Sequence, residues 1–249
     1  MARQKGLIKL EGTIGDITFY KTVDGDLARA KGGVSADRIA NDPVFVRTRE
    51  NGSEFGMAAM AGKQLRTAIR SMLLNGADNR VTARLTKVMT LIKNYDGTNV
   101  RGERNVADGI SSPGAKELLI GFDFNERATL GSVLYKPFAV DTATGQISMT
   151  GLVPINDIAF PAGATHMSLV CAFAKVGFAT NDTEVYLSPE LNLPIDGTST
   201  NVTLNPTSVP IIPGTGIYIL QIKFFQEVNG VQYSLKNGAY NALTIVDVA

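Results

Sequence analysis

The side chains that could carry out nucleophilic or acid–base catalysis are scarce in this sequence. One histidine, His166, and one cysteine, Cys171, stand among its 249 residues. A Ser-His-Asp or Cys-His arrangement would need His166 beside an activated nucleophile, and no G-x-S-x-G motif accompanies it. Cys171 lies within the apolar run MSLVCAFAKV, where a cysteine usually acts as a small buried hydrophobe. We therefore expect no catalytic residues.

One motif approaches a phosphate-binding loop. The stretch GMAAMAGKQ, residues 56–64, resembles G-x-x-x-x-G-K-[ST]. Five residues separate its glycines where the motif has four, and Gln64 stands where a Ser or Thr would bind magnesium. The stretch also lies within a helical pattern and not between a strand and a helix. We expect its small residues to let two helices approach closely, and we expect no nucleotide cofactor.

No pattern of metal ligands or paired carboxylates stands out either. The segment Asp24-Gly25-Asp26 lacks the later ligands and the terminal Glu of an EF-hand loop. Asp123 and Glu126 are a candidate carboxylate pair for glycoside hydrolysis, but nothing in their spacing singles them out. We expect no metal site, no cofactor and no enzymatic activity.

The charges are divided unequally along the chain. Residues 1–110 hold 18 Lys and Arg against 12 Asp and Glu, whereas residues 111–249 hold 6 against 11. The resulting net charges of +6 and −5 give the whole chain +1. Three interpretations stay open. The first is that the difference in net charge between the two halves is due to chance. The second is that the basic half of one copy contacts the acidic half of the next. The third is that the basic half binds nucleic acid.

The elements that would position these charges begin with a β-hairpin. Residues 7–31 alternate apolar and polar side chains around Asp24-Gly25, a pair typical of tight hairpin turns. We predict that five aromatic or basic residues of this arm contact a partner: Phe19, Tyr20, Lys21, Arg29 and Lys31. Aromatic rings beside cations also occur on surfaces that bind single-stranded nucleic acid.

Two helices follow, between Asn51 and Gly76 and between Asn79 and Gly97. Apolar residues recur at helical spacing in both, and Asn51 loosely fits a capping box. We expect the two helices to form an αα-hairpin. Basic residues lie on one side of each helix. We predict them as further partner contacts, against the alternative of a solvated outer face: Lys63, Arg66, Arg70, Arg80, Arg84 and Lys87.

The remaining sequence indicates an antiparallel β domain. Residues 97–115 are rich in Gly, Asn and Ser and are predicted to be a linker. Beyond them, apolar runs alternate with turn signals, as in a sandwich. The predicted strands are 117–124, 130–135, 146–152, 167–178, 183–188, 199–204, 217–227, 231–235 and 239–247. The predicted fold class is α+β. It has a basic region at 1–110, made of a β-hairpin arm and a helical hairpin, and an acidic, immunoglobulin-like β-sandwich at 111–249.

The sequence predicts neither a secretory signal nor a membrane span. The segment MARQKGLIKLEG has no apolar h-region, because Lys9 and Glu11 interrupt it. No run of about 18 apolar residues occurs. We expect a protein that is cytoplasmic, or that is released as part of an assembly or a virion.

Three segments carry a resemblance to a known family. They are GTIGDITFYKTVDGDLARAKGGV (12–34), FVRTRENGSEFG (45–56) and VQYSLKNGAYNALTIVDV (231–248). They resemble a family of proteins of similar length that recurs in Bacteroidota genomes, and the resemblance reaches both ends of the chain. No reaction, cofactor or catalytic residue is established for that family, so the resemblance implies none here. It is compatible with a structural, self-assembling or phage-like protein.

These observations favour assembly over catalysis. We predict a non-enzymatic structural subunit that assembles into a filament, tube or particle shell. An N-terminal β-arm and head-to-tail contacts between opposite charges would join the copies. The alternative is a binding module that holds nucleic acid through its basic half, or a surface glycan or protein through its β-sandwich.

Overall fold

A computed structural model describes residues 2–30 and 32–249, with the side chains of residues 236 and 237 left aside. The chain divides into two compact units, Met1–Arg49 and Glu50–Ala249. The predicted boundary at residue 110 therefore lies inside the second unit, whose helices and strands share one core. In the described part of the chain, no helix is long and apolar enough to cross a bilayer.

The first unit is a small antiparallel sheet followed by short helices. Its strand order is β1-β4-β3-β2. The elements are β1 (Ala2–Arg3), β2 (Gly12–Ile14), β3 (Ile17–Thr22), β4 (Gly25–Ala30), α1 (Ala36–Asn41) and the 3-10 helix η1 (Pro43–Phe45). The predicted hairpin is confirmed as β3–β4, which turns at Val23-Asp24 with Gly25 at φ 115°. The Ser35 side chain caps α1 by accepting a hydrogen bond from the Arg38 amide.

The second unit is built around a six-stranded antiparallel sheet. Its order is β12-β11-β7-β8, with β13 paired to β11 and β9 paired to β7. The strands are β7 (His166–Gly177), β8 (Asp182–Leu187), β9 (Leu191–Pro194), β11 (Thr215–Val228), β12 (Val231–Ser234) and β13 (Ala242–Val248). The two longest strands, β7 and β11, pair over eleven residues from Thr215↔Val176 to Phe225↔His166. They form the centre of the sheet.

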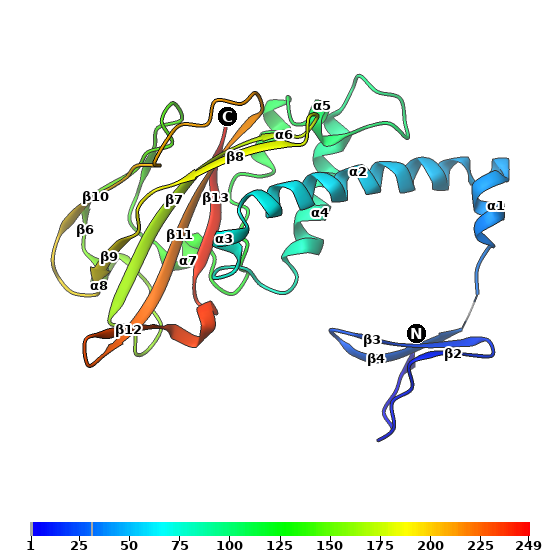
Figure 1. The fold of residues 1–249 in the computed structure, drawn as a ribbon, viewed down its shortest axis with the longest axis horizontal. Coiled ribbons are helices and arrows are strands. Elements are labelled where there is room, and N and C mark those ends of the chain that lie inside the picture. Colours follow the sequence, from blue (N-terminus) through cyan, green and yellow to red (C-terminus); the bar gives the residue numbers. More distant parts are fainter. Residues whose placement is uncertain (1, 31) are drawn as a thin grey trace. The chain divides into compact units, whose positions relative to one another are not determined.

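Both faces of this central sheet are covered. Alternate side chains of a strand point to opposite faces, so Val170 and Ala172 of β7 pack against the helices, while Leu169 and Cys171 pack against a second sheet. Figure 1 shows α2, α3 and α4 on one side of β7 and β11, and β6 and β10 on the other. The unit therefore has three layers, of helices, a six-stranded sheet and a smaller sheet.

The outer layers are a small sheet and a set of helices. The small sheet has the order β10-β6-β5, from β5 (Ala139–Val140), β6 (Ile147–Leu152) and β10 (Thr200–Leu204). The helices are α2 (Val46–Ala68), α3 (Arg70–Leu73), α4 (Val81–Ile92), α5 (Val106–Gly109), α6 (Pro113–Glu117), α7 (Leu130–Val133) and α8 (Pro154–Asp157). The 3-10 helices η2 (Lys93–Tyr95) and η3 (Leu235–Gly238) complete the unit.

The predicted helix pair is present as α2 and α4. Leu65 and Ile69 of the first segment lie in one core with Leu85 and Met89 of α4. A Cβ atom on Gly62 would meet Met89 at 3.6 Å, so the small residue sits where the helices approach closely, as predicted. The predicted start of the first helix, at Asn51, was wrong, because α2 begins at Val46 and Asn51 lies inside it.

Two predicted strands were wrong. Residues 130–135 contain the short helix α7, Glu117 ends α6, and residues 118–120 follow it as a turn. Only residues 121–124 run beside β13, where the Gly121 amide donates to the Ile245 carbonyl and the Phe124 amide to the Leu243 carbonyl, both at 2.8 Å. An apolar run of this length does not distinguish a strand from a buried helical turn. The α+β class stands, but an immunoglobulin-like sandwich is not confirmed.

Candidate functional site

The N-terminal sheet has one apolar face and one mixed face. Directly opposed residues of antiparallel strands share a face, so the pairs Ile14↔Ile17 and Phe19↔Ala28 lie on the same side. We call this side the apolar face: Ala2, Ile14, Ile17, Phe19, Ala28 and Ala30, with the charged pair Lys21↔Asp26 at its end. The opposite side carries Arg3, Thr13, Thr18, Tyr20, Leu27 and Arg29. Among the described residues 2–49, none is buried.

The predicted arm residues divide between these two faces. Phe19 is half-buried and shares the apolar face with the exposed Lys21, which stands opposite Asp26. Tyr20 lies on the other face, where the Arg29 guanidinium stacks 5.5 Å from the centre of its ring. The two aromatic rings therefore do not form one stacking platform. The fifth predicted arm residue, Lys31, lies outside the described residues.

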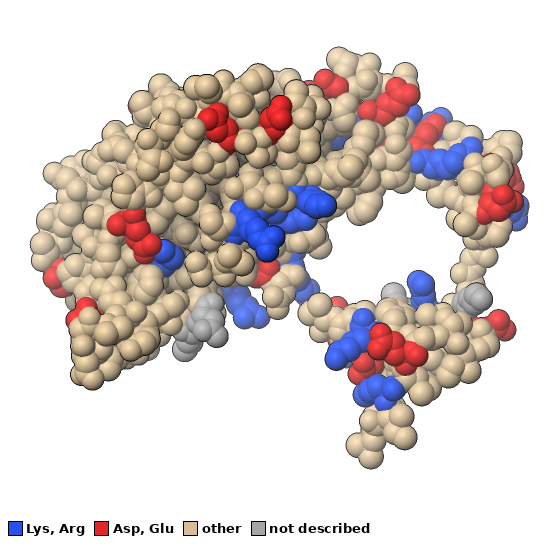
Figure 2. Space-filling model, in the orientation of Figure 1, with Lys and Arg blue, Asp and Glu red and all other residues tan. Residues whose placement is uncertain are grey.

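The six predicted helix residues do not form one free basic surface. Arg84 is engaged within its own unit, where it pairs with Asp78 at 2.5 Å and Glu126 at 3.2 Å and lies over the Phe122 ring. Arg66 is half-buried, and this burial lowers the pKa of its guanidinium. The other four predicted residues are exposed: Lys63, Arg70, Arg80 and Lys87. Figure 2 shows a group of Lys and Arg side chains where α2, α3 and α4 are drawn.

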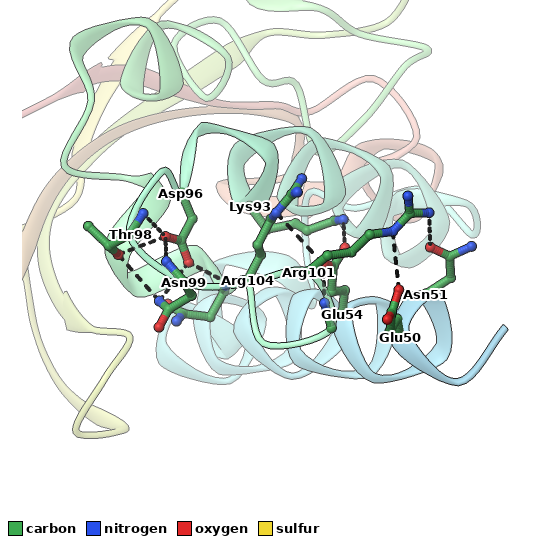
Figure 3. Close-up of polar contacts among 11 residues, drawn as sticks. Glu50, Asn51, Glu54, Lys93, Asp96, Thr98, Asn99, Arg101 and Arg104 are labelled. Atoms are coloured by element: carbon green, nitrogen blue, oxygen red, sulfur yellow. Dashed lines mark hydrogen bonds and ion pairs between the residues drawn. The ribbon is translucent and has the colours of Figure 1, made fainter. Parts of the chain in front are cut away.

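A buried ion pair joins the long helix α2 to the end of α4. Glu54 is 2% exposed, and its carboxylate accepts hydrogen bonds from the Lys93 ammonium and, at 2.8 Å, from the Gly102 amide (Figure 3). Arg104 lies 4.0 Å from the same carboxylate. Burial raises the pKa of Glu54, but these donors and charges outweigh it and hold the pKa below its ordinary value.

The adjacent loop is closed around Asp96. Its carboxylate accepts from the amides of Thr98, Asn99 and Asn105, each at 3.0 Å (Figure 3). Burial raises the pKa of Asp96, but hydrogen bonds to the charged form lower it well below its ordinary value of 3.8. All of these donors belong to the chain itself. Together, the hydrogen bonds of the loop and the ion pair of Glu54 hold residues 96–105 against α2.

A groove of about 800 Å³ lies beside this fastened loop. Its walls come from α2, from the start of α5 and from the turn between β7 and β8, and they include Met57, Met60, Val106 and Phe178. The only ionisable residues in the lining are Lys63 and Asp108. Asp108 accepts hydrogen bonds from the side chains of Asn99 and Asn105.

The single histidine and cysteine lie apart from the groove. His166 is the first residue of β7, where it contacts the Thr165 hydroxyl at 3.0 Å and Glu227 at 3.6 Å. Cys171 is buried in β7, and burial raises the pKa of its thiol, which disfavours the nucleophilic thiolate. In the described part of the chain, no three His, Cys, Asp or Glu residues gather closely enough to hold a metal ion.

Comparisons with models of protein families, with characterised proteins and with solved structures found no match for this chain. Its candidate site is therefore assigned from geometry alone. Sequence reasoning missed the Glu54–Lys93 pair, because the two residues are 39 positions apart and neither stands in a motif. It also missed that Ile14, Ile17 and Phe19 share one uncovered face, although the alternation in β3 carries that signal.

Proposed function

We propose that this protein is a non-enzymatic structural subunit that assembles with copies of itself, and that the apolar face of the N-terminal sheet is a contact between copies. One observation carries the proposal. The sheet has four paired strands, yet its unit buries no described residue. An antiparallel sheet with one apolar face normally packs that face against another layer.

The exposed side chains of this face favour such a layer. Ile14 and Ile17 are 61% and 45% exposed. Burying a large aliphatic side chain completely stabilises an association by about 1.5–3 kcal/mol. A second copy supplies the same face, so two sheets can pack face to face around a two-fold axis. The edge strand β2 also offers unpaired backbone groups to a strand of a neighbour.

The unequal charge distribution supports a second kind of contact. Residues 1–110 are basic overall and residues 111–249 are acidic, so head-to-tail contacts between copies would be attractive and weakened by salt. A head-to-tail contact combined with a face-to-face contact extends an assembly into a filament, tube or shell. The resemblance to the Bacteroidota family and the immunoglobulin-like character of the β layers stay predictions beside this proposal.

Nucleic-acid binding is the weaker alternative. It required the basic helix residues to act together, but Arg84 is already paired with two carboxylates of its own unit. Tyr20 and Phe19 also lie on opposite faces of the arm. A gel-shift assay at about 0.05 M and 0.2 M salt distinguishes this alternative, because phosphate contacts weaken steeply over that range.

The test is light scattering and negative-stain electron microscopy on the full chain and on a variant lacking residues 2–33. The deletion removes the sheet but none of the buried core, which begins at Ala58. We expect regular particles from the full chain and none from the variant, with an unchanged melting transition of the second unit. Equal assembly by both proteins, or a monomeric full chain at every concentration, would contradict the proposal.

A further inference from the structure

The connection between β1 and β2 carries the most exposed apolar pair in the first unit. The two strands lie at opposite edges of the sheet, and residues 4–11 join them. Leu7 is fully exposed and Ile8 is 82% exposed. Single exposed aliphatic residues are ordinary. Two consecutive ones at the tip of a loop form a small apolar patch that is able to contact a partner.

This loop is closed by its own hydrogen bonds. The Gln4 side chain donates to the Leu10 carbonyl at 3.2 Å and accepts from the Leu10 amide at 2.9 Å. The same side chain donates to the Leu27 carbonyl of β4, and the Gln4 amide donates to the Asp26 carbonyl. The Lys9 ammonium donates to the Gln4 carbonyl. The tip is thus presented in a fixed conformation, which lowers the entropy cost of binding.

Basic residues flank the apolar tip. Lys5 and Lys9 stand on either side of Leu7 and Ile8, and Arg3 precedes them, against the single acidic residue Glu11. Figure 1 draws this segment as the dark-blue loop that projects from its sheet. In Figure 2 the end of that projection carries no Lys, Arg, Asp or Glu atoms, while charged side chains gather at its base.

We propose that this tip inserts into the surface of a lipid bilayer that contains anionic lipids. The aliphatic side chains would enter the boundary between headgroups and acyl chains. The Lys5 stem would lie along the apolar surface while its ammonium group reaches the lipid phosphates, and Lys9 adds positive charge while its ammonium stays on the Gln4 carbonyl. The same composition fits a protein partner less well, because lysine is depleted in protein interfaces and leucine is under-represented among their energetic anchors. The tip lies outside the strands, so this contact is independent of the apolar face.

The first experiment is flotation of the full chain with two kinds of vesicle. One contains phosphatidylcholine alone, and the other contains phosphatidylcholine and phosphatidylglycerol in a ratio of about 7 to 3. We expect binding to the anionic vesicles, weakened by salt. The double change Leu7→Asn and Ile8→Asn should reduce partitioning at least about tenfold, and Lys5→Gln should reduce it about fivefold. The matched control is Val23→Asn, because Val23 is 82% exposed at a different turn of the same sheet.

The second experiment uses the absence of tryptophan from the sequence. Leu7→Trp places a single fluorescent reporter at the tip, and Val23→Trp places one at the control turn. We expect the emission of the Leu7→Trp protein alone to shift to the blue when anionic vesicles are added, and to be quenched by lipids brominated in their acyl chains. Neither variant changes a buried position, so both should fold.

Two results would overturn the proposal. Equal flotation of the wild-type chain and the Leu7→Asn, Ile8→Asn variant would show that the tip does not hold the vesicle. A blue shift of the Leu7→Trp protein that depends on protein concentration and needs no vesicles would place the tip against another copy of the chain.

Discussion

The two antiparallel sheets of this protein differ in what covers them. The central strand β7 has an almost uninterrupted apolar sequence, and both of its faces are buried, one under helices and one under the small sheet. The strand β3 alternates instead, with Ile17 and Phe19 on one face and Thr18 and Tyr20 on the other. Such alternation is typical of a sheet with one covered face, yet no described residue of that unit is buried. This difference is the basis of our proposal that a second copy of the chain covers the apolar face.

The largest predicted contrast compares one residue type in the two sheets. Phe224 is fully buried in β11, whereas Phe19 is half-buried on the apolar face. Phe224→Ala should lower the free energy of unfolding of the second unit by about 3–5 kcal/mol. Phe19→Ala should leave that value within about 0.5 kcal/mol but weaken assembly. Chemical denaturation and light scattering on both variants check this, and a large loss of stability from Phe19→Ala would break the comparison.

The next contrast concerns two lysines of the α4 region. Lys93 is paired with the buried Glu54, whereas Lys87 is exposed. Lys93→Met leaves a buried carboxylate without its partner, and we expect a loss of about 3 kcal/mol. Lys87→Met should change stability by less than about 0.5 kcal/mol. Urea denaturation measures both. Similar values for the two variants would show that the ion pair does not hold α2 against α4.

The buried carboxylates also predict how stability depends on pH. The pKa values of Glu54, Asp78 and Asp96 all lie below their ordinary values in the folded chain. Groups with lowered pKa values stabilise the fold above the pKa of the unfolded chain, and this contribution is lost as the pH falls through the folded value. Stability should therefore decline from about pH 4.5 downward.

One substitution assigns part of that decline to the loop of residues 96–105. Asp96→Asn should cost roughly 2 kcal/mol at pH 7, because it removes hydrogen bonds to a charged acceptor. The difference from the wild-type chain should shrink as the pH falls, since the wild type loses the same contribution. Denaturation curves at pH 7, 4 and 3 provide the measurement. A difference that stays constant with pH would rule out this role for Asp96.

The smallest predicted effect tests the contact between opposite charges. Raising the salt concentration from about 0.05 to 0.5 M shortens the range of electrostatic attraction to a few ångströms. Assembly through the apolar face should persist under these conditions, whereas head-to-tail contacts should weaken. Light scattering across this range separates the two contacts, and complete dissociation at high salt would show that charge alone joins the copies.

Much of the fold could be predicted from local patterns. The hairpin β3–β4, the helix pair and most strands after residue 146 follow from alternation, helical spacing and turn residues. The short helix α7 and the turn that follows α6 could not be distinguished from strands, because an apolar run of six to eight residues fits both. The helix α6 begins within residues 97–115, which were predicted to be a linker. The strand β9 was not predicted, since four residues that include Pro194 give a weak signal.

The candidate site was less predictable than the fold. The alternation in β3 separates Phe19 and Lys21 from Tyr20, but the face on which Arg29 lies depends on the register between β3 and β4. The spacing of the helix cations gave no sign that Arg84 pairs within the unit, because Asp78 precedes the helix and Glu126 lies 42 positions away. The anchoring of Glu54 likewise depends on tertiary contacts that no local pattern encodes.

The most direct test of the central claim compares two neighbouring residues on opposite faces of β3. Ile17 lies on the apolar face and Thr18 on the mixed face. Sedimentation velocity of the full chain should reveal oligomers that grow with concentration. Ile17→Asn should abolish them, and Thr18→Asn should leave them unchanged. A monomeric wild-type chain, or equal assembly by both variants, would contradict the claim that the apolar face joins copies of this protein.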